Sequence, residues 1–178
     1  MTLPAITIPN VQNYAVGKGV VSWTTDPNGT VSPTWVDLGN ISSFQLQMNA
    51  KTLEHFTSRQ GVKSRDQLIP YEFTGTLKFK IEEIIPANIA MAFMGTVASD
   101  VVQGMTLATL LGQIQFVGNN SIGHNYTWVF PSVSLMPASQ LELIGDNWQE
   151  MEANANLLSV FDSATPPNPY FFKCTRTS

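Results

Sequence analysis

The residues that could carry out chemistry in this chain are few and lie far apart. The two histidines, His55 and His124, have no cysteine or carboxylate around them at the spacing of a zinc-binding motif. The Gly-x-Ser-x-Gly sequence that presents a nucleophilic serine is absent. We therefore interpret both histidines as surface or interface residues.

Other short patterns resemble functional motifs without completing them. Gly17-Lys18-Gly19 lacks the third glycine of a dinucleotide-binding motif and no βαβ unit follows it, so it indicates a bulge or a turn. Glu82 and Glu83 are adjacent and would point to opposite faces of a strand. Glu150 and Glu152 would share a face, which leaves open a glycosidase or calcium-binding role, although exposed carboxylate pairs are usually only solvated. We expect no enzymatic activity, no metal and no cofactor.

Charged residues are scarce. Only 12% of the residues are Asp, Glu, Lys or Arg, about half of the roughly 25% found in ordinary soluble domains. Between Ile84 and Leu141, Asp100 is the only one of these. A soluble monomer usually keeps a charged surface, whereas the cores of protein interfaces are depleted in charge. One interpretation is a neutral monomer rich in hydroxyl and amide groups; we favour a subunit of an assembly.

The remaining charge is unevenly distributed. Six basic and three acidic residues lie between Lys51 and Lys80, although the net charge of the chain is −4. That balance argues against a conventional nucleic-acid-binding protein, which carries a basic face.

Cys174 is the only cysteine, so the chain cannot form an internal disulfide. The first residues lack the basic region of a secretory signal, and no apolar stretch approaches the roughly 18 residues of a membrane helix. We expect an intracellular protein without a membrane anchor.

Alternation of apolar and polar residues with a period of two predicts antiparallel strands. The clearest runs are 44–49 and 73–82, and weaker ones occur at 16–23, 113–117, 126–135, 141–144 and 148–158. In the two clear runs we expect the apolar set Phe44, Leu46, Leu77, Phe79 and Ile81 to face the core. The opposite, polar face carries Gln45, Gln47, Asn49, Thr74 and Thr76.

The sequence predicts one domain over residues 1–178. We predict a mainly β fold, a β-sandwich or open barrel of two packed antiparallel sheets with one short flanking helix and a long inter-strand loop. The helix is expected over 86–95, because proline suits the first helical position and glycine the stop. Residues 100–111 are ambiguous between a loop and a second short helix. We interpret 1–13 as an N-terminal arm and 164–178 as a C-terminal extension, in which the proline-rich residues 164–169 end the regular structure.

The segment 54–69 separates the two clearest strands and is far longer than a hairpin turn of two to five residues. It is therefore predicted to be a long loop. Long loops inside compact domains are usually functional or disordered. The apolar residues among the charges of this segment indicate that it docks on another protein surface. The residues that we assign to this contact are Glu54, His55, Phe56, Arg59, Val62, Lys63, Arg65 and Asp66.

In their order and spacing, several short pieces resemble the major tail tube proteins of long-tailed bacteriophages. The pieces are Val16–Gly19, Trp35–Phe44, Leu53–Gly61, Glu82–Gly95, Trp128–Val133 and Leu141–Trp148. The most specific of them is Leu53–Gly61, at the start of the predicted loop. The resemblance extends roughly from Tyr14 to Leu158, which is most of the chain.

The resemblance implies a structural subunit that forms homohexameric rings, with one sheet of each subunit lining a channel and the long loop reaching a neighbouring ring. The stacked rings would conduct viral DNA from the capsid to the host. The implied partners are other copies of the chain and the tape-measure, terminator and baseplate or tail-tip proteins, and double-stranded DNA would pass without specific binding. The implied location is the virion tail, assembled in the host cytoplasm.

The polar face of the two clear strands supplies candidates for the channel lining. Neutral amides and hydroxyls bind phosphate weakly, whereas each lysine or arginine contact adds salt-dependent affinity for DNA. We therefore assign Gln45, Gln47, Asn49, Thr74 and Thr76 to the lumen.

Two other functions remain open. Another tail ring protein or a secretion-system tube subunit would share the fold and differ only in its assembly. A monomeric β-sandwich binding module, for instance for carbohydrate, would need a concave aromatic site. Trp23, Trp35, Trp128 and Trp148 could supply it, although each lies in or beside a predicted strand.

Overall fold

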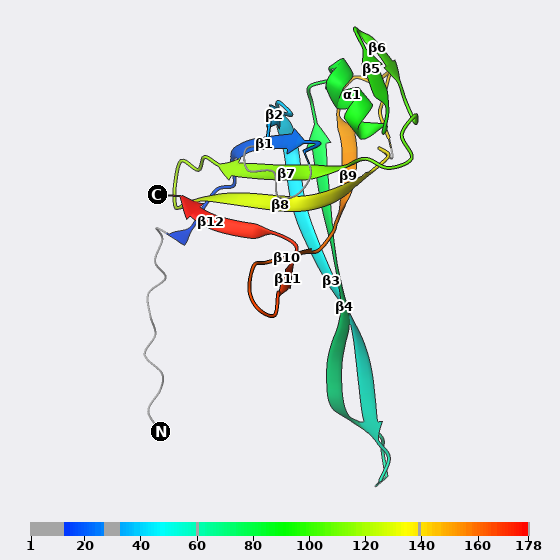
Figure 1. Cartoon of the computed structure of the whole chain (residues 1–178), viewed down its shortest axis with the longest axis vertical. Helices are drawn as coiled ribbons and strands as arrows, with labels where there is room; N and C mark the ends of the chain where they lie inside the picture. Colours follow the sequence, from blue (N-terminus) through cyan, green and yellow to red (C-terminus); the bar gives the residue numbers. More distant parts are fainter. Residues whose placement is uncertain (1–12, 27–32, 60, 139, 178) are drawn as a thin grey trace.

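The computed structural model describes residues 13–26, 33–59, 61–138 and 140–177, and these form a mainly β protein with one short helix (Figure 1). The strands are β1 (Gly19–Thr24), β2 (Val36–Asp37), β3 (Ile41–Thr57), β4 (Ser64–Ile81), β5 (Thr96–Ala98), β6 (Val101–Gln103), β7 (Leu111–Gly118), β8 (Asn125–Met136), β9 (Met151–Leu157), β10 (Val160–Phe161), β11 (Pro169–Tyr170) and β12 (Lys173–Thr177). The helix α1 spans Pro86–Ala92.

Strand β8 joins two packed antiparallel sheets. Its residues Asn125–Val129 pair with β12, and Thr127–Ser134 pair along the other edge with β7, which continues through β1 to β2. Its last residues, Val133–Met136, pair with β9, which continues through β4 to β3. The two groups of strands run in different directions (Figure 1). Within the described residues the path does not close into a barrel, because β2 and β3 remain at its two ends. The predicted β-sandwich is confirmed.

The core lies between these sheets and follows the predicted alternation. Leu77, Phe79 and Ile81 on β4 are at most 1% exposed. Their neighbours on β9 include Ala153 and Ala155, paired with Phe79 and Leu77, and these small side chains leave room for the larger ones. From β3, Phe44 and Leu46 are partly buried against the same cluster, as expected.

Aromatic rings connect the two sheets across this core. The ring of Phe44 on β3 stacks on Phe116 of β7 at a centroid distance of 5.8 Å. The same ring contacts Phe79 at 6.0 Å and Phe130 at 6.1 Å. Offset and tilted pairs at this spacing add to the stabilisation from burial alone. One residue of β3 therefore holds three strands together.

Helix α1 covers the end of the sandwich where β4 finishes. Proline starts it at Pro86, and its buried face includes Asn88 and Met91. The Asn88 side-chain amide donates to the carbonyl oxygens of Leu38 at 3.1 Å and Glu83 at 2.9 Å, which ties the helix to the strand ends. The helix is three residues shorter than predicted, since it ends at Ala92 and Met94 has a positive φ of 47°.

Three local predictions differ from the structure. Most of the predicted loop 54–69 is strand, because β3 and β4 continue as a hairpin whose cross-strand pairs the alternation pattern did not reveal. The predicted strand at 141–144 is reduced to one bridge between Leu141 and Met151. The proline-rich residues 164–169 were predicted to end the regular structure, but β12 follows them and pairs with β8. The predicted arm 1–13 lies, except for its last residue, outside the described residues.

Phe79 provides a direct test of this core. Phe79→Ala should lower the free energy of unfolding by about 3–5 kcal/mol, because it removes a ring from a fully packed environment. The measurement is denaturant unfolding of the purified protein. The control is Phe73→Ala on the same strand, where the ring is exposed and the change should stay within about 0.5 kcal/mol. Equal effects of the two substitutions would contradict the assigned core.

Candidate assembly surfaces

A two-stranded ribbon projects from the sandwich (Figure 1). Strand β9 pairs with β4 from Gly75 to Ile81, and among the described residues the outer parts of β3 and β4 pair only with each other. We call these outer parts, 50–57 and 64–73, the ribbon, and the described residues between them, 58–59 and 61–63, its tip. An isolated two-stranded hairpin is only marginally stable in water. The ribbon therefore depends on the sandwich at one end, and further contacts would stabilise it.

Large apolar side chains of the ribbon are exposed to solvent. They are Leu53, Phe56, Leu68, Ile69, Tyr71 and Phe73. They lie on both strands, and Leu53 and Ile69 are direct cross-strand partners. Large apolar side chains gathered at the surface in this number are typical of protein interaction sites. The sequence placed Phe56 in a docking segment but did not reveal the other five, because they belong to what it predicted as loop or as ordinary strand.

Cross-strand ion pairs neutralise most of the ribbon's charge. Arg65 bonds to Glu54 at 2.9 Å, and His55 lies 2.6 Å from Asp66. Closer to the sandwich, Lys51 pairs with Glu72 at 2.8 Å. The positive charge that the sequence assigned to this segment is therefore smaller than expected.

The tip differs from the ribbon. Among the described residues, neither Arg59 nor Lys63 has an ion-pair partner, and Val62 between them is 90% exposed. The tip thus presents two cations around an apolar side chain.

The predicted polar face is formed as a unit on β3 and β4. Gln47 pairs with Thr76 and Asn49 with Thr74, while Gln45 pairs with Lys78. Residues that pair directly across antiparallel strands point to the same face. On β9, Asn154 and Asn156 pair with Lys78 and Thr76 and extend this face. All five residues assigned to a lumen therefore lie together, on the side of the sheet away from the core.

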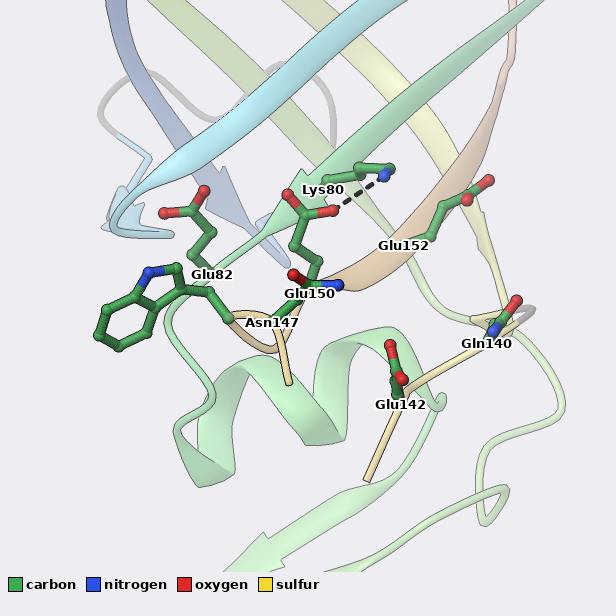
Figure 2. A pocket seen from close by; sticks show the side chains of 8 residues that line it. Lys80, Glu82, Gln140, Glu142, Asn147, Glu150 and Glu152 are labelled. Atoms are coloured by element: carbon green, nitrogen blue, oxygen red, sulfur yellow. Dashed lines mark hydrogen bonds and ion pairs between the residues drawn. The ribbon is translucent and has the colours of Figure 1, made fainter. Parts of the chain in front are cut away.

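An acidic pocket of about 470 Å³ lies at the end of the sandwich beside α1 (Figure 2). It is lined by Lys80, Glu82, Gln140, Glu142, Asn147, Trp148, Glu150 and Glu152. Strands β4 and β9 provide Lys80 and Glu152, and the rest come from the segments that follow β4 and precede β9. With four glutamates and one lysine, the formal charge of this lining is −3. The sequence indicated only that Glu150 and Glu152 share a face, since the other carboxylates come from distant loops.

Hydrogen bonds fix one carboxylate of this pocket. The Lys80 ammonium donates to Glu150 at 2.8 Å, and the Ser42 hydroxyl donates to the other oxygen of the same carboxylate at 2.9 Å. These bonds hold the pKa of Glu150 below its usual value and raise the pKa of Lys80. A general acid of a glycosidase needs a raised carboxyl pKa, which is the opposite direction. Across the described ranges, no cluster of three metal-ligating side chains is present.

The other candidate residues lie apart from this pocket. His124 Nδ1 accepts a hydrogen bond from the guanidinium of Arg176, on β12, at 2.9 Å. Trp23 is buried in the core, and Trp128 packs on Phe172 at a centroid distance of 5.2 Å. Trp148 precedes β9 and is 93% exposed, so it is not a core residue. These three tryptophans therefore do not converge on one concave aromatic site.

Comparisons with known proteins gave two findings. A family model described as "Protein of unknown function UCP028589" matches residues 14–114, which include β1 to β6, the ribbon and α1. Among solved structures, the chain is similar to one described as "Cryo-EM structure of the anti-feeding prophage (AFP) baseplate, 6-fold symmetrised". That similarity has 12% sequence identity and a TM-score of 0.40, and covers 98% of this chain and 97% of the other. No curated protein matches the chain. No helix within the described residues is both long and apolar enough to span a membrane.

The exposed apolar pairs of the ribbon can be tested without any partner. Replacing Leu53 and Ile69 together by threonine should leave the melting temperature of the subunit nearly unchanged, because neither side chain belongs to the core. Leu77→Thr, on the same strand as Ile69, is the control and should lower the melting temperature strongly, because that side chain is fully buried. A large loss of stability in the ribbon variant would show that these residues pack within the subunit.

Proposed function

The chain belongs to the family described as protein of unknown function UCP028589, and we propose that it is the structural subunit of a phage tail tube. In this proposal six copies form a ring, and stacked rings enclose a channel that conducts viral DNA from the capsid to the host. The observation that carries it is the ribbon, an exposed apolar extension with no core of its own. A subunit whose copies cover one another would bury this surface.

The distribution of charge supports the same function. Charged residues are only 12% of the chain, as suits a subunit whose sides, top and bottom all become interface. The polar face of β3 and β4 consists largely of amides and hydroxyls, which interact weakly with passing phosphates. In the proposed tube this face lines the lumen. Lys78 and Lys80 belong to the same face, and Lys80 is already paired with Glu150.

The proposed role is non-enzymatic and needs no cofactor. The partners would be other copies of the chain, together with tape-measure, terminator and baseplate or tail-tip proteins. Double-stranded DNA would pass without specific binding. The protein would be assembled in the host cytoplasm and would reside in the virion tail.

Shortening the ribbon tests its role in assembly. Residues 51–72 are replaced by Asn-Gly, a turn that suits two-residue hairpins and joins the paired residues Ala50 and Phe73. The sandwich should remain folded, because loop-closure cost changes slowly with length and the core is untouched. Tubes and higher oligomers should be lost, as seen by light scattering and electron microscopy of concentrated protein.

The matched control replaces Ser99-Asp100, the turn between β5 and β6, by the same Asn-Gly sequence. Ser99 already has a positive φ of 55°, so this turn accepts the new residues. The control should assemble like the parent protein. If the shortened variant also forms normal tubes, the ribbon is not the assembly element; if it does not fold, the ribbon is part of the fold.

The lumen assignment can be tested by labelling. In a Cys174→Ser background, Gln47→Cys should react with a small maleimide in assembled tubes and also in the free subunit. A maleimide on a large polyethylene glycol chain should label the free subunit and be excluded from the tube, because the channel interior is reached only from its ends. The control is Asp100→Cys, at an exposed turn that is not part of the polar face. Equal labelling of position 47 by both reagents in tubes would contradict the assignment.

A further inference from the structure

The ribbon tip and the acidic pocket lie at opposite ends of one continuous strand. Strand β4 begins at Ser64, next to the tip, and ends at Ile81, between the pocket residues Lys80 and Glu82. Its 18 residues span about 60 Å at 3.3 Å per residue. Figure 1 shows the tip and α1, which lies beside the pocket in Figure 2, at the two ends of the longest axis. One copy therefore cannot bring its own tip to its own pocket.

The two ends carry opposite charge. The tip presents Arg59 and Lys63, while the other charges near it are already paired within the ribbon. The pocket lining carries a formal charge of −3, and its single lysine is held by Glu150. Opposite potentials on two surfaces favour their encounter and fix their register. They also make the pocket unsuitable for nucleic acid, whose phosphates it would repel.

Each end also has an exposed apolar side chain beside its charges. At the tip this is Val62, and at the pocket it is Trp148, with Leu143 and Ile144 on the same loop. Nothing within the described residues covers the Trp148 indole, which is 93% exposed. Tryptophan is among the residues that most often dominate binding energy at interfaces, and its face attracts lysine and arginine. The two surfaces match in apolar content as well as in charge.

From this complementarity we propose that the acidic pocket with Trp148 is the docking site for the ribbon tip of a second copy. The proposal deepens the proposed function and rests on it, because it names the surface to which the ribbon binds. Contact between two different surfaces of identical chains is head-to-tail, and such contacts repeat along an axis unless they close into a ring. With donor and acceptor at opposite ends of the long axis, each added copy extends the assembly in one direction.

Reversing the charges at each end gives two variants, and neither should assemble on its own. The tip variant is Arg59→Glu with Lys63→Glu, and the pocket variant is Glu142→Lys with Glu152→Lys. Glu150 is left unchanged because it is bonded to Lys80 and Ser42. Either variant places like charges against each other, and the concentration needed for assembly should rise at least tenfold. Sedimentation and electron microscopy measure assembly, and thermal melting checks that each variant is folded.

Mixing the two variants should restore assembly. The reversed tip of one fits the reversed pocket of the other, and the remaining basic tip fits the remaining acidic pocket, so an alternating polymer can form. Lys18→Glu and Asp100→Lys reverse exposed charges outside both the tip and the pocket lining, and these control variants should assemble normally. The proposal is overturned if both reversed variants assemble like the parent. It is also overturned if both fail and their mixture fails too, since the charges would then act on other partners, such as a basic segment of a different protein.

A cysteine pair separates this docking site from the proposed tube function. In a Cys174→Ser background, Val62→Cys on one copy and Trp148→Cys on another should form a disulfide between chains under mild oxidation. Val62→Cys mixed with Asp100→Cys should not. If the specific cross-link forms while no tube appears with other tail components, the docking site stands and the tube function falls. If tubes form while the cross-link and the charge reversals have no effect, the tube function stands and this docking site falls.

Discussion

The alternation along β4 is the constraint on which the rest of the structure depends. From Gly75 to Ile81 its apolar residues face the core, and this fixes its register against β9 on one side and β3 on the other. A slip by one residue would expose Leu77, Phe79 and Ile81 and bury lysines. Because the register is locked there, the same pairing continues outward with no core beneath it. The ribbon is therefore positioned by packing that lies entirely outside it.

Strand β4 positions the functional surfaces at both ends of the molecule. At the outer end, the strand pair carries the exposed apolar residues and the tip cations away from the body. At the inner end, β4 brings Lys80 next to the start of β9, where Ser42 and Lys80 hold the Glu150 carboxylate. The acidic pocket forms around this point because three separate segments end there. Glu82 is far in sequence from the other three carboxylates, and the pairing of β4 with β9 makes it their neighbour.

Much of the sandwich could be predicted because its pattern is local. Alternation identified β3, β4 and β9 and the inward-facing residues, and Pro86 marked the start of the helix. The ribbon was missed because neither of its strands rests on a core, so Leu53 and Ile69 show no one-sided alternation, and bulges near Lys51 and His55 interrupt the period. The pocket was missed because Glu82, Glu142 and Glu152 are related only by topology. Strand β12 was not predicted because its residues are exposed and show no apolar alternation, although it pairs with β8.

The ion pairs along the ribbon have a mechanical consequence. Exposed pairs such as Lys51–Glu72 and Glu54–Arg65 contribute little to stability, and two-stranded ribbons twist more readily than wider sheets. The sandwich, in contrast, has close-packed rings between its sheets and resists shear. A filament of such subunits would concentrate its strain in the slender connectors and leave each body undeformed. Its flexural stiffness would then be set by a few exposed residues per copy, and could change in evolution without any change to the core.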